Sequence, residues 1–147
     1  MIANRTTSIE SSKTVGEIQQ MLASANASRV MIDYEDQEPS AVLFQLANGE
    51  QKLAFRMPCN WEGVLAALKK DRKYPDRLKS PEQAKRVAWR GVRDWLRVQL
   101  SFVEAGNASM HEIMVPWLIT SDGTTVSTRI FSGTSGLLAL PDRRGDS

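Results

Sequence analysis

The sequence predicts an α+β fold: an αβββα unit with a three-stranded antiparallel sheet, followed by a long amphipathic helix and a short C-terminal helix and turn. Three observations predict it. Between residues 29 and 57, three short stretches alternate apolar and polar side chains, as half-buried strands do. Asn48-Gly49 stands between the last two stretches and is typical of a two-residue hairpin turn. Before and after these strands, apolar residues recur at helical spacing.

The first helix is expected to begin at Thr14. Residues 1–13 are rich in Ser and Thr without periodicity, which predicts a disordered leader. Thr14 and Glu17 have the spacing of a capping box, in which each side chain satisfies a free backbone amide of the other. Apolar residues then follow on one face as far as Ala25, and Asn26 begins the turn into the first strand.

The three strands are predicted at residues 29–34, 40–47 and 50–57, with an acidic turn over 35–39. A two-residue turn at Asn48-Gly49 makes each residue of the second strand face a defined residue of the third. It pairs Ala47 with Glu50, Phe44 with Leu53 and Val42 with Phe55. Directly paired residues share one face of the sheet, so this register gathers the apolar side chains on one surface.

Two further helices follow the sheet. Asn60 is expected to cap a helix over residues 61–70. Ser80-Pro81-Glu82-Gln83 is a second helix start, with Ser as the cap and Pro at the first helical position. The long helix that it opens is predicted over residues 81–105, with Gly106 as a left-handed cap.

The C-terminal part contains weaker signals. Ser109 and Glu112 have the spacing of another capping box, for a short helix that ends near Pro116. Asp122-Gly123 indicates a turn. From Ser132 onward Gly, Ser, Pro and charged residues dominate. We therefore expect one α+β domain over residues 14–131 and a flexible tail over 132–147.

The composition excludes several classes of protein. One cysteine, Cys59, and one histidine, His111, cannot build a disulfide framework or a four-ligand zinc site. We expect both residues to be structural, and we expect no metal, no cofactor and no catalytic residue. No run of 18 apolar residues exists and the N-terminus lacks an apolar signal core, so the sequence predicts a cytoplasmic protein without membrane contact.

The formal charge of +2 conceals a strong segregation. Residues 1–60 hold five basic and seven acidic side chains, residues 61–106 hold eleven and six, and residues 107–147 hold three and four. The three segments therefore carry −2, +5 and −1. A patch of one sign attracts polyanions through phosphate contacts, although such charge is often only a solvated helix face.

The long helix carries the candidate site. Four arginines recur at spacings of four, three and four residues, which places them along one line of the helix opposite its apolar stripe. Guanidinium groups bind phosphates bidentately, and the neighbouring Trp89 could stack on a base. Glu82 could instead pair with Arg86, and Asp94 with Arg90, each four residues away on the helix, which would neutralise part of the row. Together with the basic segment ahead of the helix, the predicted nucleic-acid site comprises Lys69, Lys70, Arg72, Lys73, Arg86, Trp89, Arg90, Arg93 and Arg97.

Two other kinds of protein share the αβββα order. Glu50-Gln51-Lys52 resembles the Glu-x-Lys of restriction-endonuclease-like nucleases, with an acid at Asp33, Asp36 or Glu38. The hairpin register separates Glu50 from Asp36 and Glu38 by roughly 20 Å, too far for one metal ion. A double-stranded-RNA-binding domain has the same element order, but the expected lysines are missing from the helix start at Asn60.

Residues 14–131 resemble a family of short proteins encoded by bacteriophages and prophages. The resemblance lies in the helix start Ser80-Pro81-Glu82-Gln83-Ala84, the Ala88-Trp89-Arg90 and Trp95-Leu96 pairs, the end at Gly106, and Phe55-Arg56-Met57-Pro58. The family has no assigned activity, so the resemblance implies a mobile-element setting and no functional residue. Together with the basic helical face, this setting predicts a non-enzymatic accessory protein that contacts nucleic acid, with DNA in replication or recombination as the expected partner. The alternative is a protein-interaction module, such as a small inhibitor of a host defence system. A homo-oligomer through the long Trp-bearing helix is also compatible with the sequence.

Overall fold

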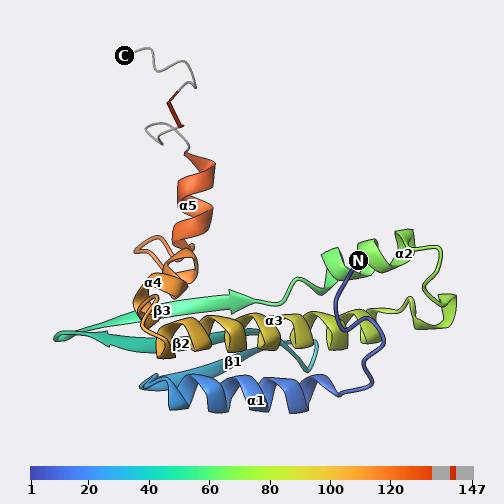
Figure 1. Ribbon diagram of the computed structural model, residues 1–147, viewed down its shortest axis with the longest axis horizontal. Helices are drawn as coiled ribbons and strands as arrows, with labels where there is room; N and C mark the ends of the chain where they lie inside the picture. Colours follow the sequence, from blue (N-terminus) through green and yellow to red (C-terminus); the bar gives the residue numbers. More distant parts are fainter. Residues whose placement is uncertain (134–139, 142–147) are drawn as a thin grey trace.

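The computed structural model describes residues 1–133 and 140–141, so most of the predicted tail over 132–147 lies outside the described residues. Within them the chain forms the predicted α+β fold, with helices on one face of a three-stranded sheet (Figure 1). The order of elements is α1 (Ser11–Ser24), β1 (Arg29–Glu35), β2 (Glu38–Asn48), β3 (Gln51–Pro58), α2 (Trp61–Lys70), η1 (Asp76–Leu78), α3 (Pro81–Glu104), α4 (Met110–Met114), η2 (Val115–Trp117) and α5 (Val126–Ser132).

The sheet is antiparallel, in the order β1-β2-β3, as predicted. The β2–β3 register differs from the prediction by two residues, because Phe44 lies opposite Phe55 and Asn48 opposite Gln51. The turn residues are therefore Gly49 and Glu50, and Gly49 has a φ of +63°. Glycine in the first central position suits a hairpin turn that needs a positive φ there. A shift of two keeps every side chain on its predicted face.

The core lies between the sheet and the two helices α1 and α3, which run side by side across one face (Figure 1). Phe44 and Phe55 stack at 5.1 Å between ring centroids in the middle of this layer. Ile18 of α1 and Leu96 of α3 are completely buried against them. The apolar stripes that predicted the helices are thus the surfaces that cover the sheet.

A second apolar cluster joins α2 to the start of α3. Leu68, Tyr74 and Ala84 form its buried centre, and Ile2 packs against them. Asn60 caps α2 and Ser80 caps α3 by accepting hydrogen bonds from the third backbone amide beyond each, as the sequence predicts. These caps fix where both helices begin.

The N-terminal segment differs from the predicted disordered leader. Helix α1 begins at Ser11 rather than Thr14, and the Thr14 side chain is buried inside it instead of capping it. Residues before the helix are held by α3 and by the loop after α2. The Tyr74 hydroxyl donates to the carbonyl of Arg5 at 2.5 Å, and the Gln83 amide donates to the carbonyl of Thr7 at 2.9 Å. Long-range contacts of this kind leave no trace in local composition.

The C-terminal part forms short helices and a turn that contact β3. Ser109 and Glu112 make the predicted capping box, and Gly123 takes a left-handed φ of +84° in the predicted turn. Ile119 donates to the carbonyl of Ala54 at 2.8 Å, which ties the loop to the sheet edge. Helix α5 was not predicted. Thr125 caps it, but seven residues are too few to show a helical period in the sequence.

Candidate nucleic-acid interface

Most of the arginine row predicted to face solvent lies instead against α1. Helices α1 and α3 pack alongside one another, and the side of α3 that carries Arg86, Arg90 and Arg93 faces the acidic side of α1. The apolar stripe of α3 covers the sheet, and the arginines lie beside it at the helix–helix boundary. The expected free phosphate-binding face is therefore largely occupied within the chain.

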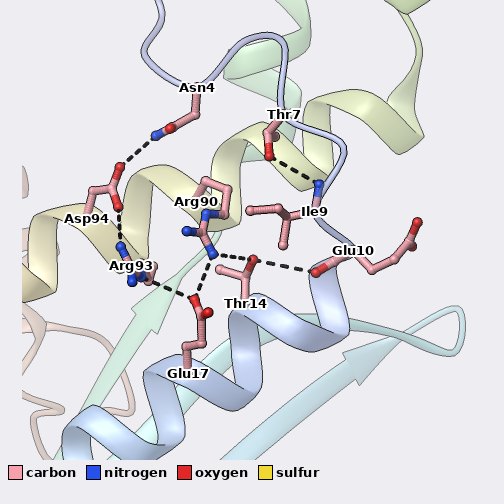
Figure 2. A network of polar contacts seen from close by, with 9 residues as sticks. All are labelled: Asn4, Thr7, Ile9, Glu10, Thr14, Glu17, Arg90, Arg93 and Asp94. Carbon is pink, nitrogen blue, oxygen red and sulfur yellow. Dashed lines mark hydrogen bonds and ion pairs between the residues drawn. The ribbon is translucent and has the colours of Figure 1, made fainter.

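Glu17 is the centre of this polar network (Figure 2). Its carboxylate accepts a hydrogen bond from Arg90 Nη1 at 2.7 Å and lies 3.2 Å from Arg93 Nε. The Arg93 Nε–H is poorly aligned with that oxygen and makes no hydrogen bond within the described residues. Arg93 instead donates through Nη1 to Asp94 at 3.1 Å. The Arg90 and Arg93 side chains are only 12% and 19% exposed, so they have little surface left for a phosphate.

The remaining helical pairs differ from the prediction. Asp94, expected to pair with Arg90, receives hydrogen bonds from Asn4 at 2.7 Å and from Arg93. Arg86, expected to pair with Glu82, lies 3.4 Å from Glu10 instead. Burial acts to raise the pKa of Asp94, but the hydrogen bonds outweigh it and hold the pKa below the ordinary 3.8. These hydrogen bonds therefore favour the charged form of the carboxylate.

Trp89 cannot serve as a platform for a nucleobase. Its side chain is 1% exposed and belongs to the main core. Stacking on a base requires an open ring face, which this residue does not have. The proposed stacking role of Trp89 is therefore wrong, because the residue lies on the side of α3 that packs against α1 and the sheet.

Arg97 differs from the other three arginines of the row. It is exposed, beyond the last acidic residue of α1, and it borders an open groove of about 550 Å³ between α1 and the second half of α3. Met21 and Leu100 line this groove together with Glu17. A single exposed guanidinium beside two apolar side chains is not enough to bind several consecutive phosphates of a nucleic acid.

The rest of the predicted site forms, together with the neighbouring Arg77, an open surface that we call the basic corner. It comprises Lys69, Lys70, Arg72, Lys73 and Arg77, at the end of α2 and in the loop that leads to α3. All five side chains are exposed. None forms an ion pair within 4 Å with an acid of the described residues. Lys69 and Lys70 also complement the dipole at the end of α2.

The two acids of this loop are already engaged by other cations. Asp71 pairs with Arg5 of the N-terminal segment, and Asp76 pairs with Lys79 at 2.9 Å. A hydrogen bond from Lys79 holds the pKa of Asp76 below its usual value. Because these acids are paired with cations outside the basic corner, its five charges are left without local compensation.

In the described fold, the side chains that the nuclease interpretation requires lie apart. Glu50 lies in the β2–β3 turn, whereas Asp36 lies in the β1–β2 turn beyond the opposite end of β2. Within the described ranges, no three His, Cys, Asp or Glu side chains are close enough to hold a metal ion. Burial raises the pKa of the Cys59 thiol to about 12, with a smaller contribution from Glu62. His111 is bound through Nε2 to the carbonyl of Ala47 at 2.8 Å.

The sequence prediction missed the partners of the arginines. Glu10 and Glu17 are seven residues apart, and so are Arg86 and Arg93. Two helices that pack alongside each other can match such rows turn by turn. That equal spacing was the available signal, but it has meaning only once α1 is placed beside α3.

Comparisons with known proteins add no relative. No family model, no curated protein and no solved structure matches this chain. In the part of the chain that the structure describes, no helix combines the length and the apolar character needed to cross a membrane.

Proposed function

We propose that this protein contacts nucleic acid through the basic corner, and that it does so without catalysing a reaction. The observation that carries the proposal is the cluster of five exposed, unpaired cations at the end of α2 and in the following loop. Phosphate neutralisation by Lys and Arg releases counterions, which is the main source of affinity in sequence-independent binding. Arg86, Arg90 and Arg93 of α3 are not part of this surface, because they pair with acidic residues of α1 and of the segment before it.

The geometry favours phosphate contact over base reading. Three cations lie in an exposed loop and two at the end of a short helix, so no long helix projects base-reading side chains into a groove. No exposed aromatic side chain lies among them, since Tyr74 is buried. We expect binding to DNA with little sequence preference.

The test is the salt dependence of binding. Fluorescence anisotropy of labelled single-stranded and duplex DNA is measured from about 50 to about 200 mM salt, where each phosphate contact steepens the dependence. Five contacts predict a slope of about −4.5 in log K against log salt for the duplex and about −3.5 for the single strand. The double substitution Lys69→Gln and Lys73→Gln should make either slope shallower by about two contacts.

A matched control removes the same charge elsewhere. Lys13 and Lys52 are exposed, and Lys52 lies beside the β2–β3 turn, far from the α2–α3 loop (Figure 1). Changing both to Gln should leave the slope as it is. Absence of binding at low salt, or an equal effect of the two double variants, would contradict the proposal. Either result would favour the alternative, a protein-interaction module such as an inhibitor of a host defence system.

The setting that we propose is a phage or prophage accessory protein in the cytoplasm of a bacterial host. Its support is the resemblance of residues 14–131 to short proteins of that origin. A pull-down from host lysate compares the wild-type chain with the variant that carries the Lys69 and Lys73 substitutions, each with and without nuclease. Capture that nuclease abolishes is mediated by DNA, and capture that survives nuclease is mediated by protein.

A further inference from the structure

Helix α5 projects from the body of the molecule, at the end remote from the basic corner (Figure 1). It has seven residues, and none of them is buried. Isolated helices shorter than about 12 residues are marginal in water, because nucleation is costly and few hydrogen bonds repay it. A helix this short normally needs a packed face, yet Ile130 is 39% and Phe131 71% exposed.

The direction of α5 is fixed by the clasp, which we define as residues 118–126. The amide of Val126 donates to the carbonyl of Leu118 at 2.8 Å, and the amide of Thr120 donates to the carbonyl of Thr124 at 2.8 Å. Asp122 accepts from the backbone amide and the hydroxyl of Thr124, at 3.0 and 2.6 Å. These contacts and the hydroxyl of Thr120 hold the pKa of Asp122 far below its usual value. Helix α5 follows without a linker, so it cannot fold back onto its own body while the clasp is closed.

The body also exposes three apolar side chains, which lie on α3 and η2. Val98 and Phe102, one turn apart on α3, are 57% and 48% exposed, and Val115 of η2 is 44% exposed. Trp95 of α3 and Trp117 of η2 connect these two elements through an edge-to-face contact, with 6.5 Å between the ring centroids. Among the described residues, α5 lies against η2 yet leaves Ile130 and Phe131 open to solvent. Val98, Phe102 and Val115 of the body are open as well.

We propose that two copies of this chain exchange α5, so that Ile130 and Phe131 of each copy pack on the Val98–Phe102–Val115 patch of the other. A reciprocal exchange of this kind closes around a two-fold axis and leaves no open end. It also removes from solvent the large apolar side chains that monomeric proteins rarely leave exposed together.

The surface available sets the expected strength. The five exposed side chains leave on the order of 400 Å² of apolar surface open in each copy, since a phenylalanine alone buries 150–250 Å² when covered. The two contacts of a closed pair bury on the order of 800 Å², below the roughly 1,200 Å² of a standard interface. We therefore expect a weak dimer whose population rises with protein concentration.

The experiment is sedimentation velocity of the full chain from about 1 µM to about 1 mM, the range in which an interface of this size associates. The wild-type chain should pass from monomer to dimer. Phe131→Asp alone and Val98→Asp alone should each remain monomeric, because both contacts of the pair are lost. Thr128→Asp, on the polar side of α5, is the matched control and should dimerise like the wild type.

A mixture of the two monomeric variants distinguishes exchange from other dimers. The intact α5 of the Val98→Asp chain can dock on the intact patch of the Phe131→Asp chain, so the mixture should recover a weaker heterodimer through one contact. A wild-type chain that stays monomeric throughout would overturn the proposal. A Val98→Asp variant that dimerises normally would also overturn it, since α5 would then be pairing with another surface. Both substitutions are at exposed positions, and circular dichroism verifies that each variant is folded.

Discussion

Replacing Glu17 with Gln tests the packing of α1 against α3 directly. The change removes the one carboxylate that serves both Arg90 and Arg93, and it nearly preserves the shape of the side chain. Hydrogen bonds to charged groups contribute about 1.5–3 kcal/mol, more than an exposed ion pair does. Because the two guanidinium groups are mostly buried, they cannot recover this energy from water. We expect the free energy of unfolding to fall by about 2 kcal/mol.

Urea denaturation measures this effect. With a slope of about 2 kcal/mol per M for a domain of this size, the midpoint should fall by about 1 M. Glu104→Gln, an exposed position on α3, removes the same charge and should stay within about 0.5 kcal/mol of the wild type. In a double-mutant cycle with Arg90→Gln, the two losses should couple by at least about 1 kcal/mol. A midpoint shift under about 0.2 M, or strictly additive losses, would refute the reasoning. Either result would mean that the arginine row of α3 faces solvent.

Three further outcomes are expected. Trp89→Ala should cost about 3–5 kcal/mol of stability in the same assay, and a change smaller than about 1 kcal/mol would mean that the indole is not in the core. Cys59 should react with an alkylating agent at pH 8 only after unfolding by urea, because its folded pKa is about 12; rapid alkylation of the folded chain would contradict this. The pKa of Asp94 is lowered on folding from 3.8, so its stabilising contribution is complete above that pH and is lost as the pH falls through the lower folded value. The stability difference between wild type and Asp94→Asn should therefore shrink below about pH 4, and a difference that does not depend on pH would exclude this linkage.

Most features that depend on neighbouring residues in the chain were predicted correctly, although the capping box at Thr14 was not. The starts of α2, α3 and α4 follow from the caps at Asn60, Ser80 and Ser109, each of which acts across only three residues. The hairpin was also recognised from local signals, and its register was wrong by two. That error preserved the faces, because side chains alternate with a period of two.

Features that depend on distant segments were not predictable. The start of α1 at Ser11 and the burial of Thr14 depend on α3, more than 60 residues further along the chain. The same holds for the candidate site. The periodicity of Arg86, Arg90 and Arg93 places them on one line of the helix, but it does not say whether that line faces solvent or α1. Exposed loop cations such as Lys73 were easier to place, since loops run over the surface.

The contacts of the N-terminal segment impose an order on folding. Asn4 bonds Asp94, 90 residues away, and the carbonyl of Arg5 accepts from Gln83, 78 residues away. Closing such long loops is entropically costly until the intervening sheet and helices have formed. Asn4 and Arg5 therefore cannot be fixed in place until α3 has been synthesised and has folded. We expect the opening residues of this chain to be the last to become protected from hydrogen exchange during folding, while the β2–β3 hairpin is protected early.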